Sequence, residues 1–122
     1  MGVDLDPGML DAARRKDPQR QWICADLASL DLETRFDVVV MAGNVPLFTP
    51  PGTQAAIVSG CARHVSTGGA LVAGFQLGRG YAIDEYDAHC SAAGLTLAER
   101  YATWDREPFP PGGDYAVSVH RR

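Results

Sequence analysis

Short apolar runs alternate along this chain with longer amphipathic stretches, and this alternation predicts parallel strands joined by crossover helices. The apolar runs predict strands over residues 2–5, 21–25, 36–42, 70–76, 95–103 and 114–120. The amphipathic stretches predict helices over residues 7–16, 53–64 and 83–93. The pattern therefore predicts an α/β fold with a mostly parallel sheet.

Turn and cap residues mark the ends of these predicted elements. Asp6-Pro7 suits the cap and first turn of the first helix, and Asp17-Pro18 should end it. Gly68-Gly69 is predicted to stop the second helix and Gly94 the third. The Pro- and Gly-rich residues 104–113 leave no room for a helix, so the last two strands are predicted to pair as an antiparallel hairpin.

The opening residues place carboxylates where nucleotide-binding sheets hold a ribose. Residues 2–10 read Gly-Val-Asp-Leu-Asp-Pro-Gly-Met-Leu, a strand that ends in acid and turns directly into a helix. Ligands of open α/β sheets bind outside the carboxyl ends of the strands, and an acid there can accept hydrogen bonds from both ribose hydroxyls. A buried strand has no structural need for Asp4, so ribose binding is the preferred interpretation. Helix capping is the stronger interpretation for Asp6, while core packing and adenine contact stay equally open for Met9.

Composition limits the chain to a single domain, residues 1–122. The chain is 46% hydrophobic and 21% charged, as expected of a globular protein with a substantial core. Its apolar runs are far shorter than the roughly 18 residues of a membrane span, and no signal peptide is visible. A net charge of -4 without a basic run argues against a nucleic-acid partner. Cys24, Cys61 and Cys90 fit no metal spacing and are expected to be buried, reduced thiols of a cytoplasmic protein.

These elements together resemble the class I S-adenosylmethionine-dependent methyltransferases, whose fold is Rossmann-like with a closing antiparallel hairpin. The resemblance covers almost the whole chain and implies S-adenosyl-L-methionine as the cofactor. It places Asp4, with Leu5 beside it, at the cofactor ribose and Met9 at an apolar wall beside the adenine. In the segment Cys-Ala-Asp-Leu, it places Asp26 near the adenine amino group and the main-chain amide of Leu27 near a ring nitrogen.

The strand over residues 36–42 resembles the fourth strand of that family. Its end passes beneath the methionine part of the cofactor and the transferred methyl group. The resemblance therefore implies that Ala42, Gly43 and Asn44 contact this part of the cofactor.

The chain departs from the family in lacking its first, central strand and the glycine-rich loop that follows. Neighbouring strands lie about 4.8 Å apart, so the strands that end at Asp4 and Ala42 would be left roughly 10 Å apart with unpaired edges. These strands are expected to close up, to borrow a strand, or to remain unstable. We accordingly expect a truncated methyltransferase domain with impaired cofactor binding, and a homodimer formed through the exposed edges.

Several polar and aromatic residues follow the predicted strands on the ligand-binding side. The segment Asn-Val-Pro-Leu-Phe over residues 44–48 matches poorly the Asn-Pro-Pro-Tyr loop of amino-methylating DNA enzymes, and we interpret it as a substrate-side loop in which Phe48 can stack. Gln76, Arg79, Tyr81 and Trp104 are further substrate-side candidates. Solvated loop positions, or packing on the hairpin for Trp104, are equally open interpretations.

No catalytic residue is assigned from the sequence. His64 is expected to be a helix-terminal cation and His120 a surface residue, and His89 lies on a helix behind the sheet. None has a carboxylate at a spacing that would define a general base. Methyl transfer is a displacement on an activated sulfonium, so positioning does most of the work and a base is needed only for a protonated nucleophile.

Three functional hypotheses follow from the sequence. The leading one is methyl transfer to a small-molecule acceptor. A nucleotide-cofactor oxidoreductase would also place an acid after its second strand, although the Asp-Leu segment at Asp26 and the closing hairpin argue against it. The third is a non-catalytic remnant or interaction module that pairs its open sheet with another chain.

Overall fold

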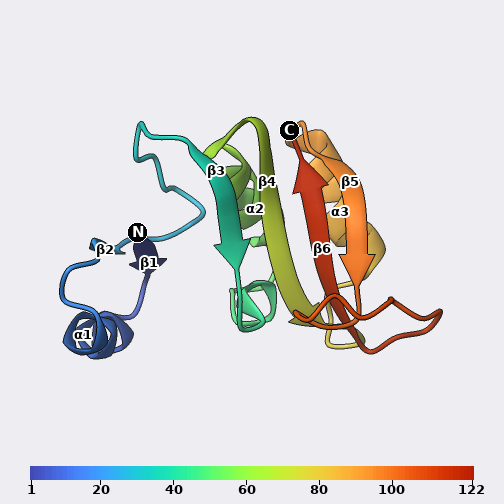
Figure 1. The fold of residues 1–122 in the computed structure, drawn as a ribbon, viewed down its shortest axis with the longest axis horizontal. Coiled ribbons are helices and arrows are strands. Elements are labelled where there is room, and N and C mark those ends of the chain that lie inside the picture. Colours follow the sequence, from blue (N-terminus) through green and yellow to red (C-terminus); the bar gives the residue numbers. More distant parts are fainter.

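The computed structural model describes residues 1–122, and its strands form two separate sheets (Figure 1). The smaller sheet pairs β1 (Gly2–Asp4) with β2 (Trp22–Cys24) in parallel. The larger sheet has the order β3-β4-β6-β5, made by β3 (Phe36–Met41), β4 (Val65–Gln76), β6 (Tyr115–Arg121) and β5 (Thr96–Tyr101). The helices are α1 (Pro7–Lys16), the 3-10 turn η1 (Val45–Leu47), α2 (Gln54–Ala62) and α3 (Ile83–Ala92).

The first three elements form a small strand–helix–strand unit, β1-α1-β2. The Asp6 carboxylate accepts a hydrogen bond from the Gly8 amide at 2.8 Å, which caps α1 as predicted. Leu10 is the one buried residue of the unit. The bounds of α1 agree with the sequence prediction to the residue.

The larger sheet carries the hydrophobic core. Helices α2 and α3 cover one face of this sheet (Figure 1), and thirteen buried residues pack between the layers. The ring of Phe75 stacks on Tyr81 at 5.5 Å between centroids and meets Tyr86 edge to face at 5.4 Å. These contacts give residues 36–121 a core of their own.

The topology of the larger sheet confirms the mixed α/β, Rossmann-like fold and its closing hairpin. β3 and β4 are parallel, as expected for strands joined by the crossover helix α2. β5 and β6 pair antiparallel, and β6 also pairs antiparallel with β4. Gly94, with φ of +86°, ends α3 as predicted.

Two local predictions were wrong. Gly68-Gly69 does not stop α2, which ends at Ala62, because β4 already begins at Val65 and runs through both glycines. Pairing explains this early start, since Val65 lies opposite Phe36 and the Gly68 amide donates to the Arg122 carbonyl at 3.2 Å. Cys24 is exposed rather than buried, and all three cysteines are free.

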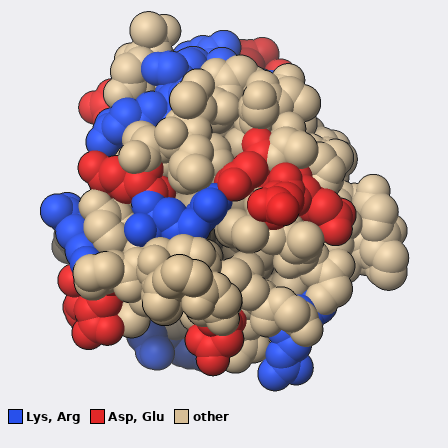
Figure 2. Space-filling model, turned by 90° about the vertical axis from the view of Figure 1, so that its right-hand side faces the viewer, with Lys and Arg blue, Asp and Glu red and all other residues tan.

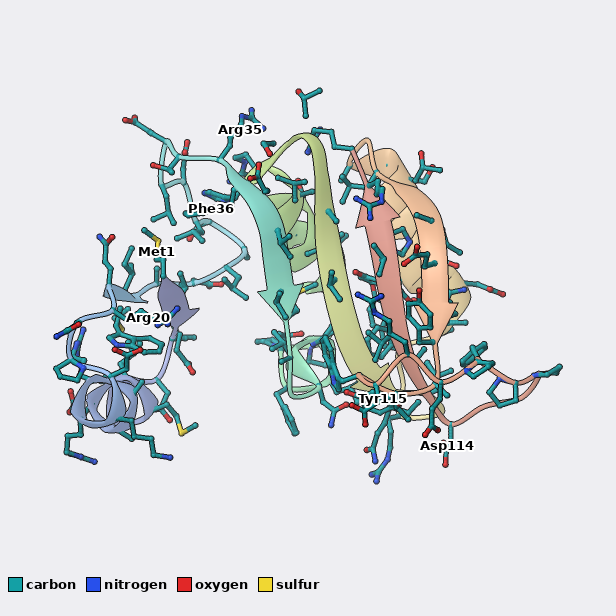
Figure 3. All side chains as sticks on the ribbon, in the orientation of Figure 1. Met1, Arg20, Arg35, Phe36, Asp114 and Tyr115 are labelled. Atoms are coloured by element: carbon teal, nitrogen blue, oxygen red, sulfur yellow. The ribbon has the colours of Figure 1, made fainter.

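No strand lies between β1 and β3, so the sheet is divided there (Figure 1). Met1 and Phe36 lie on the two sides of the division (Figure 3). The side chains of Val38 and Val40 on β3 are 56% and 55% exposed. Residues 25–35 join the two parts of the fold. None of the helices has the length and apolar character that crossing a membrane requires.

Candidate functional site

A cavity of about 820 Å³ lies at the carboxyl ends of β1, β2 and β3. It is lined by residues 3–6, 9, 25–28, 42, 43, 45, 48–50, 53 and 57. All the predicted cofactor residues except Asn44 belong to this lining, and so does Phe48. The parallel arrangement explains why, since residues that follow parallel strands meet at one edge of the fold.

Three carboxylates line this cavity, and Asp4 and Asp26 are the two that the sequence predicts to bind the cofactor. Asp4 accepts a hydrogen bond from the Asp6 amide through Oδ1 at 2.9 Å, and Asp26 accepts one from the Ala28 amide through Oδ1 at 2.9 Å. The Ala25 amide donates to the Asp4 carbonyl at 3.0 Å, which ties the ends of β1 and β2 together. Each carboxylate is therefore oriented by its own loop through one oxygen, and its second oxygen makes no hydrogen bond within the protein.

Exposed apolar side chains complete the walls of the cavity. Leu5 is 65%, Met9 61% and Phe48 80% exposed. Exposure of large apolar side chains beside a concave site is typical of ligand contact rather than of core packing. For Met9, whose role the sequence left open, the structure excludes the core interpretation.

The end of β3 has an unusual backbone. Gly43 and Asn44 both have positive φ, +76° and +62°, and a Cβ at Gly43 would have no neighbour within 4 Å. The Asn44 side chain accepts a hydrogen bond from the Gln76 amide at 2.7 Å, so it links β3 to β4 and does not line the cavity. Gly43 is thus the residue that leaves backbone open to the cavity at this point.

The remaining substrate-side candidates lie outside the cavity. Gln76 is exposed as the last residue of β4, and Arg79 and Trp104 are exposed after β4 and β5. The Trp104 indole donates to the Tyr115 hydroxyl at 3.0 Å. Tyr81 does not face the ligand side, because it is 2% exposed and belongs to the aromatic core. Its hydroxyl lies 2.6 Å from Nδ1 of His89.

The sequence analysis missed the loop after Phe48. Thr49, Pro50 and Thr53 line the cavity, and the hydroxyl of Thr53 donates to the Pro50 carbonyl at 2.6 Å. The one signal in the sequence for this loop was its position, since the run Thr-Pro-Pro-Gly-Thr over residues 49–53 directly follows Phe48, which was already assigned to the substrate side.

No buried titratable pair lies at the cavity. His64 is buried and not a helix-terminal cation, because Nε2 accepts from the Leu32 amide at 3.0 Å while Nδ1–H donates to the Gly60 carbonyl at 2.7 Å. The prediction that His120 is a surface residue was wrong, because His120 is buried with Nε2 3.0 Å from Asp87 on α3. Burial raises the pKa of Cys61 to about 11 and that of Cys90 to about 12, which keeps both thiols protonated and unreactive.

The structure contains no group of three or more His, Cys, Asp or Glu side chains suited to hold a metal ion. Its polar groups at the cavity are the carboxylates of Asp4, Asp6 and Asp26, threonine hydroxyls and backbone. Such an arrangement can bind and orient a ligand with hydroxyl and amino groups. It presents no evident general base.

A family model described as a methyltransferase domain matches residues 1–69. Among solved structures, the TehB-like SAM-dependent methyltransferase from Corynebacterium glutamicum is 31% identical with a TM-score of 0.92, over 99% of this chain and 66% of that one. The CcbJ methyltransferase from Streptomyces caelestis is 21% identical with a TM-score of 0.85, over 98% of this chain and 73% of that one.

A third similar structure is SAM-bound CalS10, an amino pentose methyltransferase from Micromonospora echinaspora. It is 19% identical with a TM-score of 0.80, over 99% of this chain and 73% of that one. This chain therefore spans about two thirds to three quarters of the lengths of these structures. No curated protein sequence matches it.

Proposed function

The chain belongs to the methyltransferase domain family, and from this membership we propose that it binds S-adenosyl-L-methionine and takes part in methyl transfer to a small-molecule acceptor. Its fold is that of the class I S-adenosylmethionine-dependent methyltransferases. The observation that carries the proposal is the pair of oriented carboxylates, Asp4 and Asp26, at the ends of two paired parallel strands in one cavity.

The cavity residues fit this cofactor in chemistry and size. A volume of about 820 Å³ lies within the range of small-molecule sites. The second oxygen of Asp4 is available to accept from the ribose hydroxyls, and that of Asp26 to accept from the adenine amino group. Met9 and Leu27 supply apolar surface for the adenine ring, while Gly43 lets the methionine part approach the backbone.

The proposed reaction needs orientation and exclusion of water more than acid–base chemistry. When bound, the cofactor supplies a methyl group on a positively charged sulfur, which is already activated for displacement. Phe48, which is 80% exposed at the cavity wall, would cover the acceptor and keep water from it. No side chain is assigned as a base, so the acceptor atom is proposed to arrive with its lone pair available.

A small molecule is the acceptor that the surface supports best. Figure 2 shows Lys and Arg interspersed with Asp and Glu on one face, without a continuous basic surface for a nucleic-acid backbone. One of the similar structures is described as an amino pentose methyltransferase. We propose that Arg79 and Trp104, exposed after β4 and β5, contact the acceptor from outside the cofactor cavity.

Calorimetric titration with S-adenosylhomocysteine tests the proposal. Asp4→Asn should weaken binding about 10- to 100-fold, because a hydrogen bond to a charged group contributes about 1.5–3 kcal/mol. Asp11→Asn is the matched control, since Asp11 lies on α1, pairs with Arg14 at 3.3 Å and does not line the cavity. Equal affinities for the two variants, or no binding by the unaltered chain, would contradict the proposal.

A second candidate function is a non-catalytic interaction module. The specific observation behind it is the pair of free strand edges on β1 and β3, through which two copies can associate as a homodimer. Sedimentation analysis over a wide concentration range tests this function. A monomer at all concentrations would leave methyl transfer as the one supported function.

A further inference from the structure

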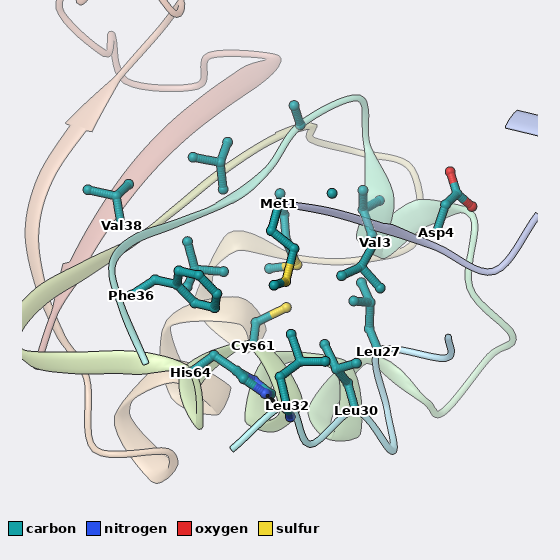
Figure 4. A pocket seen from close by; sticks show the side chains of 16 residues that line it. Met1, Val3, Asp4, Leu27, Leu30, Leu32, Phe36, Val38, Cys61 and His64 are labelled. Atoms are coloured by element: carbon teal, nitrogen blue, oxygen red, sulfur yellow. Dashed lines mark hydrogen bonds between the residues drawn. The ribbon is translucent and has the colours of Figure 1, made fainter. Parts of the chain in front are cut away.

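Both ring nitrogens of His64 hydrogen-bond to backbone groups, and these groups belong to different parts of the fold. Nδ1–H donates to the carbonyl of Gly60 within α2 at 2.7 Å, and Nε2 accepts from the amide of Leu32 in the loop 25–35 at 3.0 Å. His64 is 4% exposed, and its ring lies beside Leu32 (Figure 4). Because Nε2 must accept a hydrogen bond, the ring is neutral and carries its one proton at Nδ1.

The same part of α2 also holds a residue of the proposed cofactor cavity. The carbonyl of Leu27 packs so closely against Gly60 that a Cβ at Gly60 would lie 1.9 Å from the carbonyl oxygen. Leu27 lines the cavity next to Asp26. The ring of His64 and the cavity residue Leu27 therefore meet at Gly60. A change in the bond from His64 to the loop can reach the cavity within a few residues.

Two side-chain hydrogen bonds hold the second half of this loop to the end of α2. One joins His64 to the Leu32 amide, and the other runs from Arg63 to the Leu30 carbonyl at 2.6 Å. An arginine keeps its charge at every physiological pH. Histidine is the side chain whose charge ordinarily changes between pH 5 and 8. His64 is therefore the one of the two that can respond to pH.

We propose that His64 is a positioning residue for the cofactor cavity, which holds the loop 25–35 on α2 while its ring is neutral and releases the loop when the ring takes up a second proton. Uptake at Nε2 would set an N–H against the Leu32 amide, which would lose its acceptor. Nδ1–H would keep its bond to Gly60, so the ring would stay on α2. The effect on cofactor binding rests on the proposed function, whereas the release of the loop does not.

The surroundings of the ring offer a second proton no partner. The charged or titratable groups on the elements around it are Cys61 and Arg63 at the end of α2, Asp31, Glu33 and Arg35 of the loop, Arg122 after β6, and Asp4 across the adjoining cavity. No ion pair joins the ring to a carboxylate. Burial raises the pKa of Cys61 to about 11, so this thiol is neutral. The three arginines donate to carbonyls of residues 30, 62, 63 and 65 around the ring. A proton at Nε2 would thus gain no carboxylate in place of the Leu32 amide.

A cavity of about 460 Å³ between β1 and β3 adjoins the ring (Figure 4). The ring of His64 and the loop residues Leu30 and Leu32 line it together. The ring can therefore take up a proton without opening of the core between the larger sheet and its helices. The loop side chains also have space into which they can move once the Leu32 amide is free.

Hydrogen exchange of the full chain, resolved at single amides by NMR, tests the proposal. The readout is the protection factor of the Leu32 amide, which corrects for the pH dependence of the exchange chemistry itself. It should fall about tenfold between pH 7.5 and pH 5.5, because the amide loses its acceptor. Over the same range the affinity for S-adenosylhomocysteine, measured by calorimetry, should fall about threefold or more, because the binding-competent loop is less populated.

Three variants make the test specific. His64→Gln keeps a donor for Gly60 and an acceptor for Leu32 but does not titrate, so protection and affinity should match the parent at pH 7.5 and stay constant to pH 5.5. His64→Leu removes both bonds and should leave the Leu32 amide unprotected at both pH values. His89→Gln is the control, since Nδ1 of His89 on α3 lies 2.6 Å from the Tyr81 hydroxyl in the aromatic core. It should keep the pH response of the parent.

Three results would overturn the proposal. One is a protection factor of the Leu32 amide that is the same at the two pH values in the parent. Another is a fall in His64→Gln as large as that in the parent, which would assign the response to another group such as His120. The third is an affinity that stays constant while the protection falls, since His64 would then hold the loop without positioning the cavity.

The exchange experiment is carried out without ligand and so separates this proposal from the proposed function. A chain that releases the loop at pH 5.5 but binds no S-adenosylhomocysteine at either pH would contradict the proposed function. The same chain would still confirm that the protonation of His64 controls the loop.

Discussion

The strand–helix–strand unit over residues 2–24 and the larger sheet with its helices over residues 36–121 differ in how much they bury. The larger part has a thirteen-residue core. In the smaller part, Leu10 is the one buried residue. A strand–helix–strand unit of this size cannot bury enough surface to be stable alone. Asp4, one of the two carboxylates proposed to bind the cofactor, therefore lies on the part of the fold that depends on the other.

That dependence runs through a few contacts between the loop 25–35 and the end of α2. Arg63 donates to the Leu30 carbonyl at 2.6 Å, and His64 accepts from the Leu32 amide at 3.0 Å. Gly60 lets the Leu27 carbonyl approach so closely that a Cβ there would lie 1.9 Å from the carbonyl oxygen. The positions of Asp26 and β2 follow from these contacts.

The largest expected effect comes from removing a side chain of the core. Phe75→Ala should lower the free energy of unfolding of the larger part by about 3–5 kcal/mol, because it deletes a buried ring and leaves a cavity among Tyr81 and Tyr86. Urea unfolding followed by circular dichroism measures the change. Leu97→Ala, at a 40% exposed side chain, is the control and should cost far less. Similar losses in both variants would contradict a core localised at Phe75.

A smaller effect should separate the two parts without unfolding either. Gly60→Ala favours helix α2 by about 0.5–1 kcal/mol, yet the new Cβ collides with the Leu27 carbonyl. The loop should shift at a cost of about 1–3 kcal/mol, as in other overpacked sites. We expect faster hydrogen exchange in β2 and weaker S-adenosylhomocysteine binding, with α3 and β6 unaffected.

Ser59→Ala is the matched control for this change, since Ser59 is the exposed neighbour of Gly60 on the same helix. It should leave both exchange and binding unaltered. Normal exchange in β2 of Gly60→Ala would show that the loop does not hold the smaller part in place.

A third change acts within the smaller part alone. Asp6→Ala removes the side-chain acceptor for the Gly8 amide and should destabilise α1 by about 1 kcal/mol. Because the unit has little core of its own, this loss should appear as faster exchange in α1 while the urea midpoint of the larger part stays constant. Asp6→Asn retains an acceptor and should restore most of the protection. A shifted midpoint for Asp6→Ala would mean that the two parts unfold together.

Local signals predicted the elements of both parts better than they predicted the connections between elements. The Asp6-Pro7 start and Asp17-Pro18 end located α1 correctly because caps and breakers act within a few residues. The prediction that Gly68-Gly69 ends α2 was wrong, because β3 and Arg122 hold these glycines within β4. Both partners are distant in sequence. Strand pairing of this kind leaves no local pattern.

The same distinction applies to the candidate site. Asp4 and Asp26 could be assigned to one site from sequence, because the carboxyl ends of parallel strands share an edge. Tyr81 was assigned to that edge from its position after β4, but its ring completes the aromatic core with Phe75 and Tyr86. The local sequence does not distinguish a tyrosine that follows a strand and faces a ligand from one that faces the core.

The smallest predicted effect belongs to the larger part and depends on pH. His120 and Asp87 lie 33 residues apart in sequence, so spacing did not reveal their contact, yet Nε2 of His120 lies 3.0 Å from the Asp87 carboxylate. Burial lowers the pKa of His120 below its ordinary value, and the Asp87 carboxylate opposes this shift. The nearby Arg100 charge acts with burial to lower the pKa of His120, and because Asp87 opposes both, the net effect on stability should be small.

The direction of that effect follows from proton linkage. The unfolded chain, in which a histidine titrates near about 6.5, binds a proton more readily than the folded chain does. The contribution of His120 to the free energy of unfolding is therefore full above pH 7 and is lost as pH falls through about 6.5 toward the lower folded pKa. His120→Gln keeps a donor for Asp87 and should flatten the change in urea midpoint between pH 7.5 and 5.5. Hydrogen exchange in α1 is the control, and at each of these pH values it should be the same in the variant and the parent. An unchanged slope in His120→Gln would mean that the buried histidine does not couple the larger part to pH.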